Sequence, residues 1–278
     1  MVRFDQGGRG YRTCREWYPR RDEALYIELL FGQTYREPLI TGEPWRVVPD
    51  PCAHLLFVAG GSAASGWTRE PTLRLVGPRS TYVDIDNTGR TIMLGVRLRP
   101  GVLASLMGSD ARNLTDQSAS AEELFGKAGR ELLDRVASSL IPESATRDLA
   151  AFVVGRVCSR PRRGPDPTIL ADALTHTVSI DATADAMGVT PRAVHRCAVS
   201  GIGLAPKRLV RIQRLHRALA LMLTPRFVAD GDCSGRSGLC GPGAPLARLL
   251  GAIGRIARQV SVPRCPKRSR VPCCVCVG

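Results

Sequence analysis

The chain has 278 residues and a formal net charge of +14, with 39 Lys and Arg against 25 Asp and Glu. This length suffices for about two domains, each with a core of its own. The first ten residues lack the apolar stretch of a secretion signal, and no uninterrupted apolar run approaches the ~20 residues that span a bilayer. These features exclude secreted and membrane-inserted classes, and we expect a cytoplasmic protein with no membrane partner.

The excess positive charge lies in the C-terminal part of the chain. Residues 1–159 hold 20 basic and 19 acidic residues, residues 160–226 hold 11 and 4, and residues 227–278 hold 8 and 2. A basic module joined to a neutral one is typical of a regulator with separate nucleic-acid and signal domains, because only the basic part must displace counterions from phosphate. The charge distribution therefore indicates two functional units.

Short β-branched or apolar runs, broken by Pro, Gly and Asn-Thr-Gly turn signals, predict strands in the N-terminal region. These runs are residues 45–48, 54–60, 72–76, 81–86 and 91–98. After Pro100 the apolar residues take helical spacing, which predicts helices over residues 102–107, 121–140 and 145–158. We expect an α+β chain whose β-rich N-terminal domain, a small sheet or barrel with helices, covers residues 1–158.

A segment rich in proline and arginine, residues 159–167, predicts a linker. At its end Asp166 and Pro167 are placed to cap and start a helix. Residues 168–226 then predict an all-α module. Residues 227–278 contain Gly, Pro, Cys and Arg without clear periodicity, so we expect an irregular tail that is disordered or out of frame.

Within the module, residues 180–187 predict a short helix with one apolar face. The residues of this face are Ile180, Ala184 and Met187. Gly188 follows where a left-handed helix stop is easiest, and Thr190 and Pro191 supply the cap and the first position of a second helix. This order is that of a helix-turn-helix.

The second helix divides into an apolar face and a basic face. Its inward stripe is Val194, Cys197 and Ala198, and its outward face carries Pro191, Arg192, His195 and Arg196. Arginine forks match guanine O6 and N7 in the major groove, and they also neutralise phosphate. Arg192 and Arg196 are therefore the leading candidates for base contacts.

After a turn at residues 201–203, Pro206 starts a longer helix with an apolar stripe and a basic remainder. The expected stripe is Leu209, Ile212, Leu215, Leu219 and Met222, and the basic residues are Lys207, Arg208, Arg211, Arg214 and Arg217. Such a charge run alone fits a solvated face as well as a nucleic-acid surface. The preceding pair of helices favours nucleic acid.

The runs G-V-T-P-R-A-V-H-R and G-L-A-P-K-R-L-V-R-I-Q-R-L-H-R-A-L resemble the first helix-turn-helix and linker helix of the AraC/XylS family of bacterial transcription regulators. The resemblance covers about residues 180–219. It implies sequence-specific binding of double-stranded DNA, with the second helix in the major groove. The residues that it places toward DNA are Thr190, Pro191, Arg192, His195, Arg196, Lys207, Arg208, Arg211 and Arg214.

Two core positions depart from the family pattern. Thr183 stands where such regulators usually carry leucine, and Ala198 stands where they usually carry phenylalanine. With family-like packing, an alanine in a phenylalanine site forfeits on the order of 3–5 kcal/mol. We therefore expect a module of marginal stability.

Three N-terminal elements, REWYP, VVPDPCAHLLF and LGVRLRPG, resemble in that order a domain of unknown function that accompanies AraC-type regulators. This second resemblance spans about residues 11–160. It implies a ligand-sensing or dimerising domain of cupin-like or related β-rich build, with a small-molecule effector and a second copy of the chain as partners. No residue in this region points to a particular ligand.

Sequence motifs for catalysis are absent. The chain has no G-x-S-x-G elbow, no Walker loop and no H-E-x-x-H. Asp84 and Asp86 share a predicted strand face, but a solvated strand edge explains them more simply. The histidines His54, His176, His195 and His216 are scattered along the sequence. We expect neither enzyme activity nor a cofactor.

Six of the ten cysteines lie within residues 227–278. They are Cys233, Cys240, Cys265, Cys273, Cys274 and Cys276. The last three are too close together for a tetrahedral C-x-x-C site, and no second pair accompanies them. A prenylation box fails because Val275 stands fourth from the end. We therefore expect no metal site.

AraC-type modules carry a second helix-turn-helix after the linker helix, and residues 227–278 show no such pattern. A shift of one base lets permitted codons of residues 238–245 read Gly-Tyr-Ala-Asp-Gln-Ala-His and one further residue, and those of residues 246–249 continue as Ser-Arg-Asp-Phe. This is the second-motif signature of the family, G-Y-x-D-Q-x-H-x-x-R-x-F. We hypothesise that the tail is translated out of frame, which impairs the regulator by removing one of its two recognition helices.

Two alternative functions stay open. A non-specific basic protein that binds nucleic acid by charge would show the same salt dependence, but substitution of Arg192 or Arg196 would weaken its binding to all sequences equally. A small-molecule-binding protein that uses the β-rich domain would have a deep polar pocket with converging titratable groups. The helix-turn-helix resemblance favours a sequence-specific regulator.

The nucleotide sequence under residues 220–250 tests the frameshift. We expect the shifted frame to spell the second-motif signature beneath residues 238–249, because a single lost or gained base leaves the downstream codons intact. DNA sequencing of this region is sufficient. A shifted frame that does not encode the signature removes the hypothesis.

Overall fold

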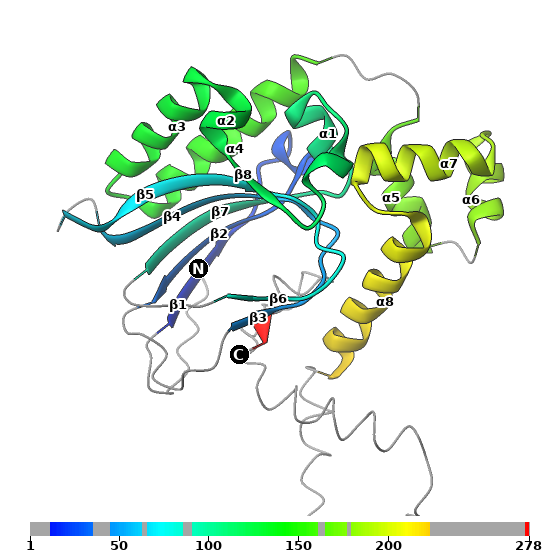
Figure 1. Cartoon of the computed structure of the whole chain (residues 1–278), viewed down its shortest axis with the longest axis horizontal. Coiled ribbons are helices and arrows are strands. Elements are labelled where there is room, and N and C mark those ends of the chain that lie inside the picture. The colour runs from blue at the N-terminus through cyan, green and yellow to red at the C-terminus, as the bar shows by residue number, and fades with distance from the viewer. Residues whose placement is uncertain are drawn as a thin grey trace, which may run out of the picture.

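The computed structural model describes residues 12–35, 45–62, 66–85, 91–160, 165–176, 179–222 and 276–277. Within these residues the chain is α+β, with an antiparallel sheet and its covering helices first and a helical unit after them (Figure 1). The predicted fold class is confirmed at this level. None of the described helices is both long and apolar enough to cross a membrane.

The larger sheet of the described residues has six strands in the order β1-β2-β7-β4-β5-β8, and each neighbouring pair is antiparallel. Their bounds are Arg12–Trp17 (β1), Ile27–Tyr35 (β2), His54–Ser62 (β4), Gly66–Val76 (β5), Thr91–Leu98 (β7) and Ser118–Ser120 (β8). The sequence predicted β4, β5 and β7 but missed the other three. The edge strands β1 and β8 are rich in polar residues, so their extended form depends on pairing with a neighbour.

Helices cover one face of this sheet (Figure 1). They are α1 (Val102–Met107), α2 (Ala121–Phe125), α3 (Lys127–Ser138) and α4 (Pro142–Cys158). Alternate residues of the two central strands point toward them and form the main core, because successive side chains of a strand face opposite sides. These residues are Leu55, Phe57 and Ala59 of β4 and Leu94, Val96 and Leu98 of β7.

The prediction of one helix over residues 121–140 is wrong. Gly126 has a left-handed φ of +60° and separates α2 from α3, because this backbone conformation cannot continue a right-handed helix. The helix predicted over residues 145–158 starts earlier, at Pro142, where the fixed φ of proline suits the first helical position.

A smaller sheet lies across the other face of the large one (Figure 1). It pairs β3 (Trp45–Val47) with β6 (Val83–Ile85) and with β9 (Cys276–Val277). The first two strands are shorter than the predicted runs at residues 45–48 and 81–86. The predicted tail, apart from residues 276–277, lies outside the described residues.

The helical unit follows the N-terminal domain and has its own core. It consists of α5 (Pro167–His176), α6 (Ile180–Met187), α7 (Pro191–Cys197), a π-helical turn η3 (Ala198–Ile202) and α8 (Pro206–Met222). The hydrophobic cluster at the centre of this core consists of Leu170, Ala171, Leu174, Ala184, Val194, Ala198, Ile202 and Leu209. They come from every element of the unit, so each helix is held by the others.

The helix boundaries of this unit follow the predicted caps. The Thr190 hydroxyl accepts a hydrogen bond from the Ala193 amide at 3.2 Å, and Gly188 ends α6 with a φ of +64°. The Asp166 carboxylate accepts from the Thr168 amide at 2.8 Å, which caps the start of α5. Each cap satisfies an amide that has no partner inside its own helix.

Both positions that depart from the AraC/XylS pattern lie in the core of the unit. Thr183 and Ala198 are fully buried. The Thr183 hydroxyl donates to the carbonyl oxygen of Ser179 at 3.0 Å, one turn earlier in the chain. This bond satisfies the polar atom that replaces an apolar leucine, so burial of the threonine leaves no unpaired hydroxyl.

The predicted apolar stripe of α8 is wrong at Leu215, which is 38% exposed. Leu209, Ile212 and Leu219 are buried as predicted, and the half-buried His216 occupies the place expected for Leu215. Residues four apart lie on the same face of a helix, so the stripe continues from Ile212 to His216. Leu215 is six residues after Leu209, so it points away from the buried face. The side chain of Met222 lies outside the described residues.

Two glycines allow the helical unit to approach the sheet domain closely. An added Cβ at Gly101 would lie 2.5 Å from the carbonyl carbon of Pro167, and one at Gly203 would lie 2.7 Å from Thr115 Oγ1. At Gly203 the Thr115 hydroxyl donates to the carbonyl oxygen at 2.7 Å. The two units therefore pack directly against each other, beyond their covalent connection.

Alanine substitution separates this close packing from simple backbone strain. Gly203 and Gly188 both have a left-handed φ, but an added Cβ at Gly203 would lie 2.7 Å from Thr115 Oγ1, whereas Gly188 has nothing within 4 Å. We expect Gly188→Ala to lower the free energy of unfolding by about 1–2 kcal/mol. Gly203→Ala adds an overpacking cost of about 1–3 kcal/mol. Urea unfolding measures both free energies. Equal losses of unfolding free energy in Gly188→Ala and Gly203→Ala would contradict close packing between the units.

Candidate functional site

Helix α7 presents the predicted basic face to solvent. Arg192, His195 and Arg196 are exposed, as are Thr190 and Pro191 at its start. On the opposite side Val194 is 1% exposed and Ala198 is fully buried. The burial pattern therefore agrees with the predicted inward and outward faces.

Helix α8 also exposes the basic residues that the sequence places toward DNA. Lys207, Arg211 and Arg214 are exposed. Arg208 is exposed too, but its Nη1 donates to the Ser80 hydroxyl of the sheet domain at 2.7 Å. One member of the predicted set therefore contacts the N-terminal domain.

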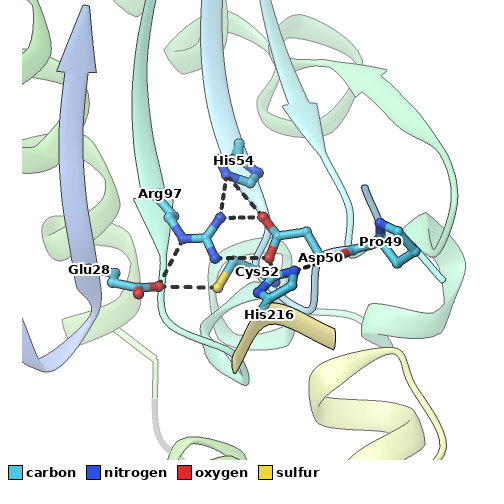
Figure 2. Close-up of polar contacts among 7 residues, drawn as sticks. All are labelled: Glu28, Pro49, Asp50, Cys52, His54, Arg97 and His216. Atoms are coloured by element: carbon cyan, nitrogen blue, oxygen red, sulfur yellow. Dashed lines mark hydrogen bonds and ion pairs between the residues drawn. The ribbon is translucent and has the colours of Figure 1, made fainter. Parts of the chain in front are cut away.

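A second contact joins α8 to the sheet domain. The His216 ring nitrogen Nε2 donates to the carbonyl oxygen of Pro49 at 2.6 Å, since a carbonyl oxygen only accepts. Figure 2 shows the His216 ring beside Asp50, the residue that follows Pro49. Sequence reasoning had left this histidine without a role.

Asp50 belongs to a buried polar group that we call the Arg97 cluster, composed of Glu28, Asp50, Cys52, His54 and Arg97 (Figure 2). The Arg97 side chain is 3% exposed and forms two bonds to the Asp50 carboxylate, from Nη1 to Oδ2 and from Nη2 to Oδ1 at 3.0 Å. Its Nε donates to Glu28 Oε2 at 2.9 Å. The guanidinium is therefore held on two sides by carboxylates.

Strand register gathers these side chains. Arg97 of β7 pairs with His54 of β4 on one side and with Leu29 of β2 on the other. The register of β2 shifts between Ile27 and Leu29, and this irregularity places Glu28 within reach of the guanidinium. Asp50 comes from the segment before β4, where its Oδ1 also accepts from the Cys52 amide at 2.9 Å.

The ion pair dominates the electrostatics of the cluster. A buried guanidinium is costly unless carboxylates and hydrogen bonds compensate for the lost water. Burial raises the pKa of Asp50, but the attraction of Arg97, His54 and His216 and the hydrogen bond from Arg97 together outweigh burial and lower that pKa to about 2. Asp50 is therefore ionised at neutral pH. Loss of Arg97 would leave Asp50 as a buried uncompensated charge, and loss of Asp50 would remove one of the two carboxylates that compensate Arg97.

The two remaining members of the cluster are uncharged at neutral pH. Burial lowers the pKa of His54 to about 4, although Asp50 opposes this shift. Burial also raises the pKa of the Cys52 thiol well above its usual value, and its Sγ lies 3.2 Å from Glu28 Oε2. A protonated, buried thiol is a poor nucleophile.

A metal does not fit this arrangement. Among the described residues no group of three or more His, Cys, Asp or Glu side chains is placed to hold a metal ion. In the Arg97 cluster the guanidinium already occupies the position between the carboxylates of Asp50 and Glu28, where it supplies the compensating positive charge (Figure 2).

Residues 16–120 match the family model of a domain of unknown function, DUF6597. No curated protein and no solved structure matches the chain. The match begins in β1, includes all five members of the Arg97 cluster and ends at β8. The expectation of an N-terminal domain of unknown function is thus confirmed over these residues. The match leaves out α5 to α8.

Sequence reasoning missed the Arg97 cluster, although one local signal was present. Arg97 stands between Val96 and Leu98 in an otherwise apolar run, which is typical of a strand buried on both faces. A charged side chain in such a strand needs an oppositely charged partner. The structure also brings His54 and His216 to the two sides of Asp50, although 162 positions separate them in the numbering of the chain. The predicted Asp84 is exposed on β6, and Asp86 lies outside the described residues.

Most of the cysteine-rich tail lies outside the described residues. Cys233, Cys240, Cys265, Cys273 and Cys274 lie outside the described residues, and Cys276 is described only as part of β9. The predicted linker is described in part. Arg160 donates to the carbonyl oxygens of Ser105 and Leu106 at the end of α1, each at 3.2 Å, and this fixes the start of the linker to the sheet domain.

Acid should destabilise the sheet domain through His54. Because its folded-state pKa, about 4, is below the ordinary 6.5, the unfolded chain binds the proton more readily. The contribution of neutral His54 to the free energy of unfolding is fully present above pH 6.5. It is lost as the pH falls toward 4, and the loss is on the order of 3 kcal/mol. Urea unfolding across this range measures the loss.

The matched variants for this test are His54→Gln and His176→Gln. We expect His54→Gln to flatten the pH dependence of the unfolding free energy, because it removes the buried titrating ring. His176→Gln changes an exposed histidine outside the cluster and should keep the wild-type slope. The same slope in wild type and His54→Gln would contradict a buried neutral histidine.

Proposed function

We propose that the chain binds double-stranded DNA through α7 and α8, as a transcriptional regulator of the AraC/XylS type. The observation that carries this proposal is the two-sided character of α7. Its Arg192, His195 and Arg196 are exposed, while Val194 on the other side packs among the other helices of the unit. Such a helix is fixed in orientation and offers a basic surface.

The chemistry of this surface suits a DNA groove. The major groove admits an α-helix, and an arginine fork matches the two acceptors of guanine. Arg192 and Arg196 lie four residues apart on α7, so they project from the same side. Thr190 fixes the start of α7 by its cap, which lets this end approach base edges without an unpaired amide.

Helix α8 supplies charge for the phosphate backbone. Lys207, Arg211 and Arg214 are exposed along its length, and Arg208 becomes available when it leaves Ser80. Contacts to about four phosphates give a slope of log affinity against log salt of about −3.5. Phosphate contacts set the register of the protein on the duplex but carry little sequence information.

The affinity of this arrangement should be low. The described residues contain one α6-turn-α7 unit. The frameshift hypothesis removes the second unit that AraC-type modules carry after the linker helix. Two recognition helices would read successive major grooves about 34 Å apart, and one helix reads half of the bases. We therefore propose weak, strongly salt-dependent binding with limited selectivity.

DNA titration of purified variants tests the proposal. We expect Arg192→Ala and Arg196→Ala each to cost about 1–3 kcal/mol on the preferred sequence and to relax selectivity at one base position. Lys207→Ala should weaken binding to all sequences and reduce the salt slope by about 1. Arg69→Ala, an exposed arginine of β5, is the matched control and should bind like wild type.

Three outcomes discriminate between the candidates. No binding at low salt would exclude the DNA function. Equal weakening of all sequences by Arg192→Ala would indicate charge-driven, non-specific binding. Tight and selective binding at physiological salt would contradict the loss of a second recognition helix.

A further inference from the structure

We propose that the sheet domain restrains the DNA-binding helices through a two-point latch on α8, and that this latch keeps DNA affinity below that of the released helices. The latch consists of Pro49, Ser80, Arg208 and His216. Its effect on DNA affinity rests on the proposed function, whereas its existence as a restraint on α8 does not.

The two contacts of the latch hold α8 at separated points. Arg208 Nη1 bonds to Ser80 Oγ at 2.7 Å, and His216 Nε2 bonds to the Pro49 carbonyl oxygen at 2.6 Å. Eight residues of helix separate them, or about 12 Å along the axis. Two contacts at this spacing fix the direction of α8 relative to the sheet domain more firmly than one contact would.

Both contact points belong to one rigid part of the sheet domain. Asp50 and Arg79 pair as an isolated antiparallel bridge, with backbone bonds of 2.9 and 2.7 Å in the two directions. This bridge joins the Pro49 segment to the Ser80 segment. Asp116 adds support, since its Oδ1 accepts from the Ser80 amide at 2.7 Å.

Asp116 is itself held in an unusual conformation. It has a left-handed φ of +60°, which no other non-glycine residue of the described chain has. Its amide donates to the Pro78 carbonyl oxygen at 2.9 Å. A non-glycine residue keeps such a backbone only where its surroundings over-determine it. The backbone around Asp116 therefore holds Ser80 in a fixed position.

The latch is also tied to the interior of the sheet domain. Asp50 holds the Pro49 segment, and its carboxylate is bonded to Arg97, which reaches Glu28 on β2 (Figure 2). Any change that separates Arg97 from Asp50 must move the Pro49 segment, to which His216 is hydrogen-bonded. A signal received on the sheet thus has a continuous set of polar contacts leading to α8.

The contacts oppose DNA binding for two reasons. Arg208 directs one of its five N–H groups to Ser80, so a phosphate that takes this N–H must displace the serine. Helix α8 also packs on the core that holds α7, through Leu209. Fixing α8 against the sheet domain therefore limits the adjustment of α7 in a groove. The free energy of the latch is subtracted from that of DNA binding.

The test uses Ser80→Ala and His216→Leu in the full chain, with two readouts. We expect each variant to raise affinity for a short DNA duplex at low salt by about two- to ten-fold, which corresponds to one net hydrogen bond. Without DNA, we expect faster amide hydrogen exchange in residues 207–219. His216→Leu keeps apolar bulk on the stripe of α8, so it preserves packing while it removes the donor.

Matched controls remove similar groups away from the latch. Ser118→Ala deletes a hydroxyl that accepts from Arg74 Nη2 at 3.1 Å within the sheet domain. His176→Leu replaces an exposed histidine at the end of α5. Both controls should leave α8 exchange and DNA affinity at wild-type values.

The outcomes separate the latch from the proposed function. Unchanged exchange in α8 in both latch variants overturns the latch, whatever the DNA result. Faster exchange with lower or unchanged DNA affinity overturns the restraint on binding. Faster exchange while no form of the protein binds DNA, even at low salt, upholds the latch and overturns the DNA function.

Discussion

The guanidinium of Arg97 lies buried between two strands, and its charge has to be balanced inside the protein. Asp50 and Glu28 supply that balance, one from the segment before β4 and one from the irregular part of β2. Because both carboxylates compensate one buried charge, the cluster fixes three chain segments that share no local sequence relation. The position of the Pro49 segment, and with it the support of α8, depends on this pairing.

From that constraint the arrangement of the two units follows. The sheet domain presents the Pro49 and Ser80 segments as one platform, and α8 contacts it through His216 and Arg208. Glycines at the junction bring the backbones together where any side chain would collide. The basic face of α7 stays open to solvent. The protein thus combines a free basic surface with a restrained supporting helix.

Much of the helical unit could be predicted, because its signals are local. Gly188, Thr190 and Pro191 set the end of one helix and the start of the next through backbone preferences that operate within a few residues. The match to a domain of unknown function over residues 16–120 likewise agrees with the N-terminal resemblance. By contrast, β1 and β8 are polar edge strands whose form depends on a neighbouring strand. The prediction of the apolar stripe of α8 was wrong at Leu215. The polar His216 faces inward there, and the apolar pattern alone does not predict this.

The sequence by itself determined the α+β class, the starts of α5, α7 and α8, the end of α6 and the inward and outward faces of α7. These features depend on caps, turns and apolar spacing, which are physical preferences of short segments. Only the tertiary structure decided that Arg97, Asp50 and Glu28 meet, and that His216 reaches the Pro49 segment. Such contacts join residues far apart in the chain, and strand register and helix packing, rather than any local pattern, bring them within bonding distance.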